Sequence, residues 1–137
     1  MPATNTATGS VDVLVVGGGP AALCISAALA ERGLTVGVLS KTEQRQSWAN
    51  TYGIWGQEVD DLGLAHLLSH RWQHTLSHFG ADGIAHGRDY GLFDKAKLQE
   101  HWLASGERHG VRWWCDAAHG IEHGRDTSSV STAGGLA

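Results

Sequence analysis

A glycine-rich stretch near the N-terminus has the residue types and spacing that bind a phosphate group. Within "VVGGGPAALC", Gly17, Gly19 and Ala22 fit the pattern Gly-x-Gly-x-x-Gly/Ala. The first glycine allows a tight turn out of a strand, the second lets a diphosphate approach the backbone, and the alanine lets a helix pack closely on a sheet. The start of that helix adds unpaired N–H groups and a partial positive charge. We therefore predict a dinucleotide-binding turn made by Gly17, Gly18, Gly19, Pro20, Ala21 and Ala22.

The position that usually binds the ribose departs from this pattern. An Asp or Glu commonly ends the second strand and accepts a hydrogen bond from a ribose hydroxyl, but this chain has Ser40 followed by Lys41. A serine bonds a hydroxyl more weakly than a carboxylate does, and Lys41 would tolerate a 2′-phosphate. On local chemistry alone, Ser40 would therefore contact FAD, NAD or NADP.

A strand, a helix and a second strand are needed to position these residues. Residues 11–16 are apolar and β-branched, which is typical of a strand buried on both faces of a parallel sheet. Residues 20–32 repeat apolar side chains at helical spacing, and Gly33 ends that helix. Residues 34–40 form a second apolar run. This βαβ order predicts an α/β fold, a Rossmann-like FAD/NAD(P)-binding domain with a parallel sheet, incomplete in this chain.

The second half of the chain predicts three more elements. Asp94 is a candidate N-cap for a helix whose inner face carries Leu98, Trp102 and Leu103, with Gly110 just past its end. Residues 111–115 then predict a third strand, and the weak alternation of residues 118–133 predicts an antiparallel hairpin.

The middle of the chain predicts a loop followed by a helix. Residues 41–63 are polar with scattered aromatics, and Asp60 or Asp61 is a candidate N-cap for a helix that continues to about residue 70. Residues 71–80 could continue this helix or turn to a strand. Four histidines are spaced four apart, as in helical zinc sites: His66, His70, His74 and His78. On a helical projection they lie opposite the apolar residues, where a solvated face would be, so we predict no metal site.

Composition excludes several classes of function. Ten Lys and Arg against fourteen Asp and Glu give a net charge of −4, which argues against a nucleic-acid-binding surface. Two cysteines point to a reducing compartment. No apolar stretch reaches the ~20 residues that span a bilayer, and residues 1–10 lack the features of a signal peptide. We interpret residues 1–10 as a disordered leader.

Several further residues resemble the lycopene cyclases of the plant and cyanobacterial type. That family has a glycine-rich FAD turn, then an Asn-x-Tyr-Gly-Val/Ile-Trp segment closely followed by a Glu, then a Trp, then a Tyr-Gly pair before a helix. The matching residues, within a resemblance over residues 11–123, are Asn50, Tyr52, Gly53, Ile54, Trp55, Glu58, Trp72, Tyr90, Gly91, Lys95 and Leu98.

The resemblance implies a flavin-dependent, non-redox reaction. The ends of linear lycopene would close to ionone rings, β or ε, with β as the expectation. The cofactor would be reduced FAD, with NAD(P)H as its reductant. Lycopene dissolves in membrane lipid, so the enzyme would contact a membrane peripherally at its cytoplasmic face, at the thylakoid or plasma membrane in a cyanobacterium. Residues 11–137 would be the N-terminal part of the enzyme, inactive alone, because the second flavin motif and the acidic motif lie beyond Ala137.

The resemblance also suggests roles for individual residues. Tyr52 and Trp55 would form a wall that stabilises a carbocation by cation–π interactions, about 0.5–2 kcal/mol each; alternatively they pack as core aromatics beneath a loop. Glu58 could act as an acid or base, although a solvated helix start is the favoured reading. Lys95 stands where the wider superfamily often has an arginine near the flavin, and it keeps the charge but loses the planar fork.

Two alternatives stay open. Another FAD-dependent oxidoreductase, such as a monooxygenase or a prenyl reductase, would share the glycine turn but not "NTYGIWGQE". A non-catalytic nucleotide-binding fragment would share the turn and have no activity.

Overall fold

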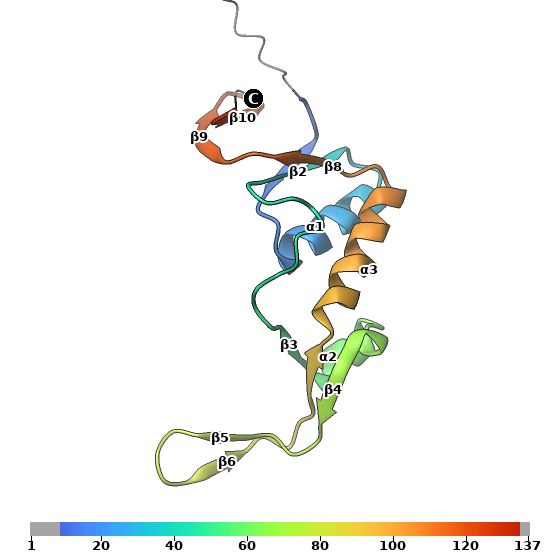
Figure 1. Ribbon diagram of the computed structural model, residues 1–137, viewed down its shortest axis with the longest axis vertical. Coiled ribbons are helices and arrows are strands. Elements are labelled where there is room, and N and C mark those ends of the chain that lie inside the picture. Colours follow the sequence, from blue (N-terminus) through green and yellow to red (C-terminus); the bar gives the residue numbers. More distant parts are fainter. Residues whose placement is uncertain (1–8, 135–137) are drawn as a thin grey trace, which may run out of the picture. The chain divides into compact units, whose positions relative to one another are not determined.

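The computed structural model describes residues 9–134 in two compact units. The first contains the residues up to Gln46 and those from His101 onward, and the second is Ser47–Glu100. Figure 1 shows the elements coloured along the chain. Most of the predicted leader, residues 1–10, lies outside the described residues.

A parallel sheet forms the centre of the first unit. Its strands β1 (Val13–Val16), β2 (Val36–Ser40) and β8 (Arg112–Cys115) lie in the order β1-β2-β8, and both pairings are parallel. The predicted βαβ unit and third strand are therefore confirmed. The prediction that the first strand is buried on both faces is wrong, because Val13–Val15 are only partly buried and Val16 is 53% exposed. The central strand β2 is buried throughout.

One face of this sheet is covered by the helix α1 (Pro20–Glu31). Leu23, Ala27 and Ala30 are buried on its inner side, and Val36 and Val38 of β2 are among the most buried side chains. Small alanine side chains let a helix lie close to the strands that it covers. Gly33, with φ +90°, ends the helix as predicted.

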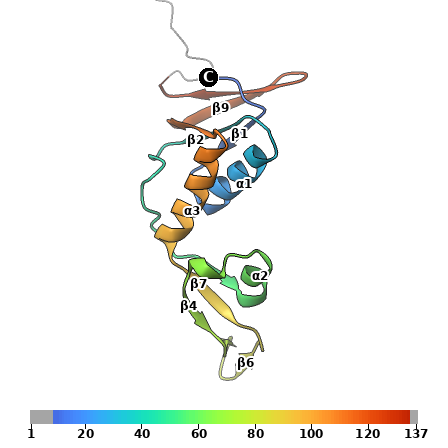
Figure 2. The ribbon, with the colours of Figure 1, turned by 90° about the vertical axis from the view of Figure 1, so that its right-hand side faces the viewer.

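The other face of the sheet is turned toward an antiparallel hairpin of β9 (Ala118–His123) and β10 (Ser128–Thr132). Figure 2 shows α1 and this hairpin on opposite sides of the sheet. Asp116 fixes the hairpin, since its carboxylate accepts hydrogen bonds from the Thr132 hydroxyl and from the backbone amides of Ala117 and Gly134. These bonds, led by the one from Thr132, lower the pKa of Asp116.

The helix α3 (Lys95–Arg108) starts in the second unit and ends in the first. Asp94 Oδ1 accepts hydrogen bonds from the amides of Ala96 and Lys97, each at 3.1 Å, which confirms the predicted N-cap. Gly110 follows the helix with φ +76°. Leu98 and Leu103 are buried as expected.

A second, antiparallel sheet forms most of the second unit. Its strands β3 (Gly53–Trp55), β7 (Tyr90–Phe93) and β4 (Leu68–Trp72) lie in the order β3-β7-β4. The short helix α2 (Gly56–Asp61) and the 3₁₀ turn η1 (Ala65–Leu67) connect β3 to β4. A separate hairpin, β5 (Leu76–His78) and β6 (Gly83–Ala85), joins β4 to β7.

The prediction of a helix starting at Asp60 or Asp61 is wrong. These aspartates end a helix that begins at Gly56, and Gly63 with φ +67° then turns the chain away from the helical path. Leu68 and the residues after it form a strand instead. The four-residue spacing of the histidines therefore does not place them on one α-helix, because His70 and His78 lie on two different strands and His66 lies in η1.

Among residues 9–134, the helices are all too short or too polar to cross a lipid bilayer.

Candidate functional site

The glycine turn joins the end of β1 to the start of α1. Gly17 has φ +126°, a backbone conformation that side chains with a Cβ rarely adopt, so glycine is required there. Its N–H donates a hydrogen bond of 2.8 Å to the Leu39 carbonyl, which ties the turn to the end of β2. The turn therefore lies at the carboxyl ends of two parallel strands, where open α/β sheets bind their ligands.

Gly19 keeps the space above the helix start open. It is the N-cap, with φ −82° and ψ −179°, and a Cβ built on it would meet no protein atom within 4 Å. No side chain caps the helix, and the first intrahelical bond runs from Leu23 N–H to Gly19 O, at 3.1 Å. The amides of Ala21 and Ala22 precede that bond and are free to bind an anion. This turn therefore fits the diphosphate of a dinucleotide such as FAD.

Ser40 lies against the same turn. A Cβ on Gly18 would come within 2.8 Å of the Ser40 hydroxyl, so the serine side chain sits beside the turn at the end of β2. Ser40 is buried, and its hydroxyl lies 3.0 Å from the hydroxyl of Thr42, a neighbour that was not predicted from the sequence. The structure thus brings Ser40 to the predicted edge of the site, with its hydroxyl already hydrogen-bonded.

The second unit brings three aromatic residues of the family resemblance into one row. Trp55 on β3 and Trp72 on β4 both lie opposite Tyr90 on the central strand β7. Opposite residues of an antiparallel pair share a face, and the rings of Trp55 and Tyr90 meet edge to face with centroids 5.3 Å apart. The Tyr90 ring lies over Gly53, where a Cβ would collide with it. We call Trp55, Tyr90 and Trp72 the aromatic row.

Trp55 already has a cationic neighbour in this chain. The guanidinium carbon of Arg88 lies 4.2 Å from the centroid of its ring, and the same guanidinium is 3.4 Å from Glu58 Oε1. Arg88 therefore occupies one face of the Trp55 ring in a cation–π contact. Glu58 is more than half exposed, which agrees with the solvated alternative for this residue.

Tyr52 belongs to a different aromatic pair from Trp55. Its ring meets the buried Trp48 edge to face, with centroids 5.6 Å apart. Lys95, the first residue of α3, donates a hydrogen bond of 3.4 Å from Nζ to the Ala49 carbonyl. The wall formed by Tyr52 and Trp55, and the flavin contact of Lys95, stay predictions.

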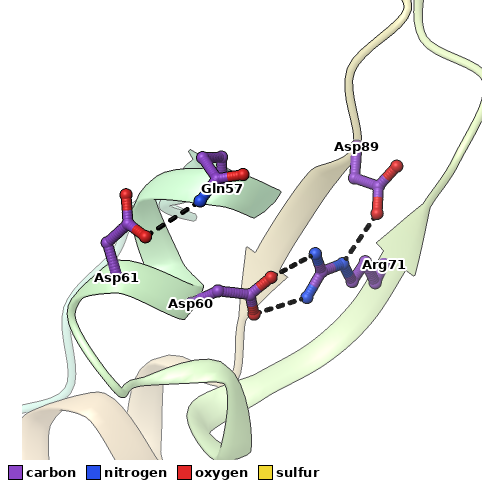
Figure 3. Close-up of polar contacts among 5 residues, drawn as sticks. All are labelled: Gln57, Asp60, Asp61, Arg71 and Asp89. Atoms are coloured by element: carbon purple, nitrogen blue, oxygen red, sulfur yellow. Dashed lines mark hydrogen bonds and ion pairs between the residues drawn. The ribbon is translucent and has the colours of Figure 1, made fainter.

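Arg71 holds the second unit together through an ion-pair cluster (Figure 3). Its two terminal nitrogens each donate a hydrogen bond of 2.8 Å to Asp60, and Nε donates one of 3.1 Å to Asp89. The Arg71 guanidinium lowers the pKa of Asp60, chiefly through these hydrogen bonds. A side chain on Gly56 would collide with Arg71 and Asp89, so this glycine lets α2 and β4 approach.

Arg71 and its partners could not be found from the sequence. Asp60 is 11 residues before Arg71 and Asp89 is 18 residues after it, and no local pattern connects them. By joining α2, β4 and the start of β7, the cluster fixes the sheet on which the aromatic row lies.

Comparison with known proteins gives the family. A family profile described as "Lycopene cyclase protein" matches residues 12–136. The lycopene beta cyclase of Synechococcus elongatus is 50% identical over 124 residues, which cover 90% of this chain and 30% of that relative. The chain thus spans about a third of the length of this curated relative.

Solved structures share the fold at low sequence identity. A geranylgeranyl bacteriochlorophyll reductase-like protein from Thermoplasma acidophilum matches 91% of this chain and 35% of its own, with a TM-score of 0.66 and 16% identity. The flavin-dependent brominase Bmp2 matches 86% of this chain and 32% of its own, with a TM-score of 0.63 and 16% identity. The predicted α/β class is confirmed by these likenesses and by the parallel sheet, and the profile match shows that the chain belongs to the lycopene cyclase family.

Proposed function

We propose that residues 11–137 are the N-terminal, FAD-binding part of a lycopene beta cyclase. The observation that carries this proposal is the 50% identity to a cyanobacterial lycopene beta cyclase over 90% of the chain. The remaining motifs of the reaction would lie in the rest of the enzyme, so this chain alone would be inactive.

The glycine turn is the part of the proposal that the geometry supports directly. Gly17 shapes the turn, Gly19 leaves room for the diphosphate, and the amides of Ala21 and Ala22 would donate hydrogen bonds to it. The Ser40 hydroxyl would reach a ribose hydroxyl at the end of β2. Bound FAD, reduced by NAD(P)H, would supply negative charge near a cationic substrate.

Ring closure needs an environment that tolerates positive charge without water. Protonation of a terminal double bond of lycopene gives a carbocation, which closes a six-membered ring and then loses a proton, so the reaction has no net redox change. Trp55, in the aromatic row, would present a π face to that cation, worth about 0.5–2 kcal/mol. Arg88 occupies one face of this ring, so the substrate cation would use the other face or displace Arg88.

The substrate also requires contact with a membrane. Lycopene is dissolved in lipid, so the enzyme would meet it from the cytoplasmic face of a membrane as a peripheral protein.

Pigment analysis tests the proposal. The complete enzyme that contains this chain should convert lycopene to β-carotene in bacteria that accumulate lycopene, with the product identified by chromatography. A yellow, flavin-loaded protein that leaves the lycopene unchanged would favour another FAD-dependent enzyme, a monooxygenase or prenyl reductase. A product with ε rings would refute the β assignment, and cyclisation by residues 1–137 alone would refute the assignment of the chain as an inactive part.

A further inference from the structure

The end of β2 carries two hydroxyl groups where a dinucleotide-binding fold commonly carries a carboxylate. The residues there are Ser40, Lys41 and Thr42. Ser40 Oγ and Thr42 Oγ1 lie 3.0 Å apart, and the Thr42 N–H donates a hydrogen bond of 3.3 Å to Ser40 Oγ. A serine hydroxyl that accepts from the amide two residues later makes a local turn, so the two side chains are held together. We call Ser40 and Thr42 the hydroxyl pair.

The hydroxyl pair lies against the glycine turn. A Cβ built on Gly18 would lie 2.8 Å from Ser40 Oγ and 3.4 Å from Thr42 Oγ1. The next residue, Gly19, is the one above which the space is open. In this kind of fold the diphosphate sits at the start of the helix and the ribose lies toward the end of the second strand. Both hydroxyls therefore lie beside the path that a dinucleotide would follow.

The third strand of the sheet fixes the backbone of the pair. The Ser40 carbonyl accepts a hydrogen bond of 2.9 Å from the Asp116 amide, just past the end of β8. The Thr42 carbonyl accepts a hydrogen bond of 3.3 Å from the indole N–H of Trp113, which lies in β8. Both residues of the pair are thus attached to the same neighbouring segment, so their hydroxyls are positioned before any ligand binds.

The hydrogen bonds inside the pair determine what it can offer to a ligand. A hydroxyl has one proton and two lone pairs. If Ser40 donates to Thr42 and accepts the Thr42 N–H, Ser40 keeps one lone pair and Thr42 keeps its proton. The opposite direction would leave the proton of the buried Ser40 without an acceptor among residues 9–134, which costs free energy. The pair therefore presents an acceptor on Ser40 and a donor on the half-buried Thr42.

One acceptor and one donor match the two hydroxyl groups of a ribose. A carboxylate can only accept, so both ribose hydroxyls must donate to it. The hydroxyl pair would instead accept from one ribose hydroxyl and donate to the oxygen of the other. These bonds involve no ionised group, so each is about half as strong as a bond to a carboxylate.

We infer that Thr42 is a second ribose-binding residue, and that the hydroxyl pair replaces the usual carboxylate in holding the adenosine ribose of FAD. This inference rests on the proposed function, which places FAD at the glycine turn. Thr42 belongs to neither the glycine pattern nor the family motifs, and only its contact with Ser40 and its place beside Gly18 bring it to the site.

Glu43 is the competing residue, because it is the next carboxylate along the chain. Its side chain lies near Cys115, the residue that pairs with Ser40 in the register of β2 with β8. Burial, followed by the charge of Glu43, raises the pKa of the Cys115 thiol. Glu43 is therefore turned toward β8, and Glu43→Gln should leave FAD affinity unchanged.

Titration of the flavin-free complete enzyme with FAD, followed by flavin fluorescence, tests the inference. Thr42→Val should weaken FAD binding about twofold to tenfold, the effect of one neutral hydrogen bond, and Thr42→Ser should bind FAD as the parent does. Thr35→Val is the matched control. Thr35 precedes β2 at the opposite end of the strand, where its hydroxyl donates a hydrogen bond of 2.7 Å to Asp12, so its loss should leave FAD affinity unchanged.

An FAD analogue built on 2′,3′-dideoxyadenosine separates a ribose contact from a change in the fold. The parent should bind this analogue more weakly than FAD, and Thr42→Val should bind the analogue as tightly as the parent binds it. If Thr42→Val weakens binding of both ligands by the same factor, Thr42 has a structural role only and the inference is wrong. Unchanged FAD affinity in Thr42→Val, or a loss in Glu43→Gln instead, would also overturn it.

The parent enzyme separates failure of this inference from failure of the proposed function. A parent that binds no FAD would refute the proposed cofactor. A parent that prefers FAD to the dideoxy analogue through Thr42 but cyclises no lycopene would refute the function alone. A parent that cyclises lycopene while Thr42→Val binds FAD normally would refute the role of Thr42 alone.

Discussion

Gly19→Ala should separate cofactor binding from stability. The new methyl group would occupy the space above the α1 N-terminus, where no protein atom lies within 4 Å of the Cβ. It would push a diphosphate away from the amides of Ala21 and Ala22. A hydrogen bond to a charged group contributes about 1.5–3 kcal/mol, so loss of one such bond should weaken FAD binding about tenfold to a hundredfold.

The same substitution should barely change the free energy of unfolding measured without FAD. The backbone at Gly19 is extended, so alanine fits it. Lower entropy of the unfolded chain gains about 0.4–1 kcal/mol, and the poorer N-cap loses a similar amount. Titration with FAD, followed by flavin fluorescence, and urea unfolding of the complete enzyme give the two quantities.

Gly33→Ala is the opposite control. Gly33 has φ +90° at the far end of α1, so alanine there should cost about 1–2 kcal/mol of stability and leave FAD affinity unchanged. If Gly19→Ala binds FAD as tightly as the parent, the diphosphate does not approach this turn, and the proposed cofactor site is refuted.

Three further predictions concern the second unit. Trp55→Phe should retain most of the cyclisation activity. Trp55→Ala should lower kcat about twofold to thirtyfold, which corresponds to a cation–π contribution of about 0.5–2 kcal/mol. If chromatography shows that Trp55→Ala cyclises lycopene as fast as the parent, Trp55 is not part of the substrate wall. Arg71 lowers the pKa of Asp60, so their pair stabilises the fold above about pH 4, and this stabilisation is lost as pH falls through the lowered pKa. Asp60→Asn should therefore reduce the loss of unfolding free energy that urea titrations measure as the pH falls below about 4. An unchanged pH dependence would contradict the stabilising role of the Asp60–Arg71 pair. Gly53→Ala should displace the Tyr90 ring and cost about 1–3 kcal/mol, with a changed near-ultraviolet circular dichroism spectrum; an unaltered spectrum would show that the ring does not lie on Gly53.

The first unit could be predicted because its signals are local. The apolar run before Gly17, the helical spacing after Pro20 and the positive φ at Gly33 all lie within about one βαβ unit. In the second unit, Asp94 gives a similarly local signal, because it caps the helix that follows it directly. The partial exposure of β1 could not be predicted, because it depends on which elements pack on its two faces.

The second unit depends on pairings between distant residues. Leu64, Leu67 and Leu68 have helical spacing, but Gly63 ends the helix and Leu68 pairs with Phe93 in a sheet. Propensity is a weak prior where tertiary contacts decide. The sequence indicates the three residues of the aromatic row only as separate matches to the family. Their positions opposite one another follow from the register of the sheet, which the sequence does not reveal.

The unshared edge of β1 has a consequence for handling the protein. Among residues 9–134, Val13–Val16 pair with β2 alone, so one side of this apolar strand presents backbone groups that another polypeptide can recruit. Residues 1–137 produced by themselves should oligomerise as their concentration rises, by strand addition between copies.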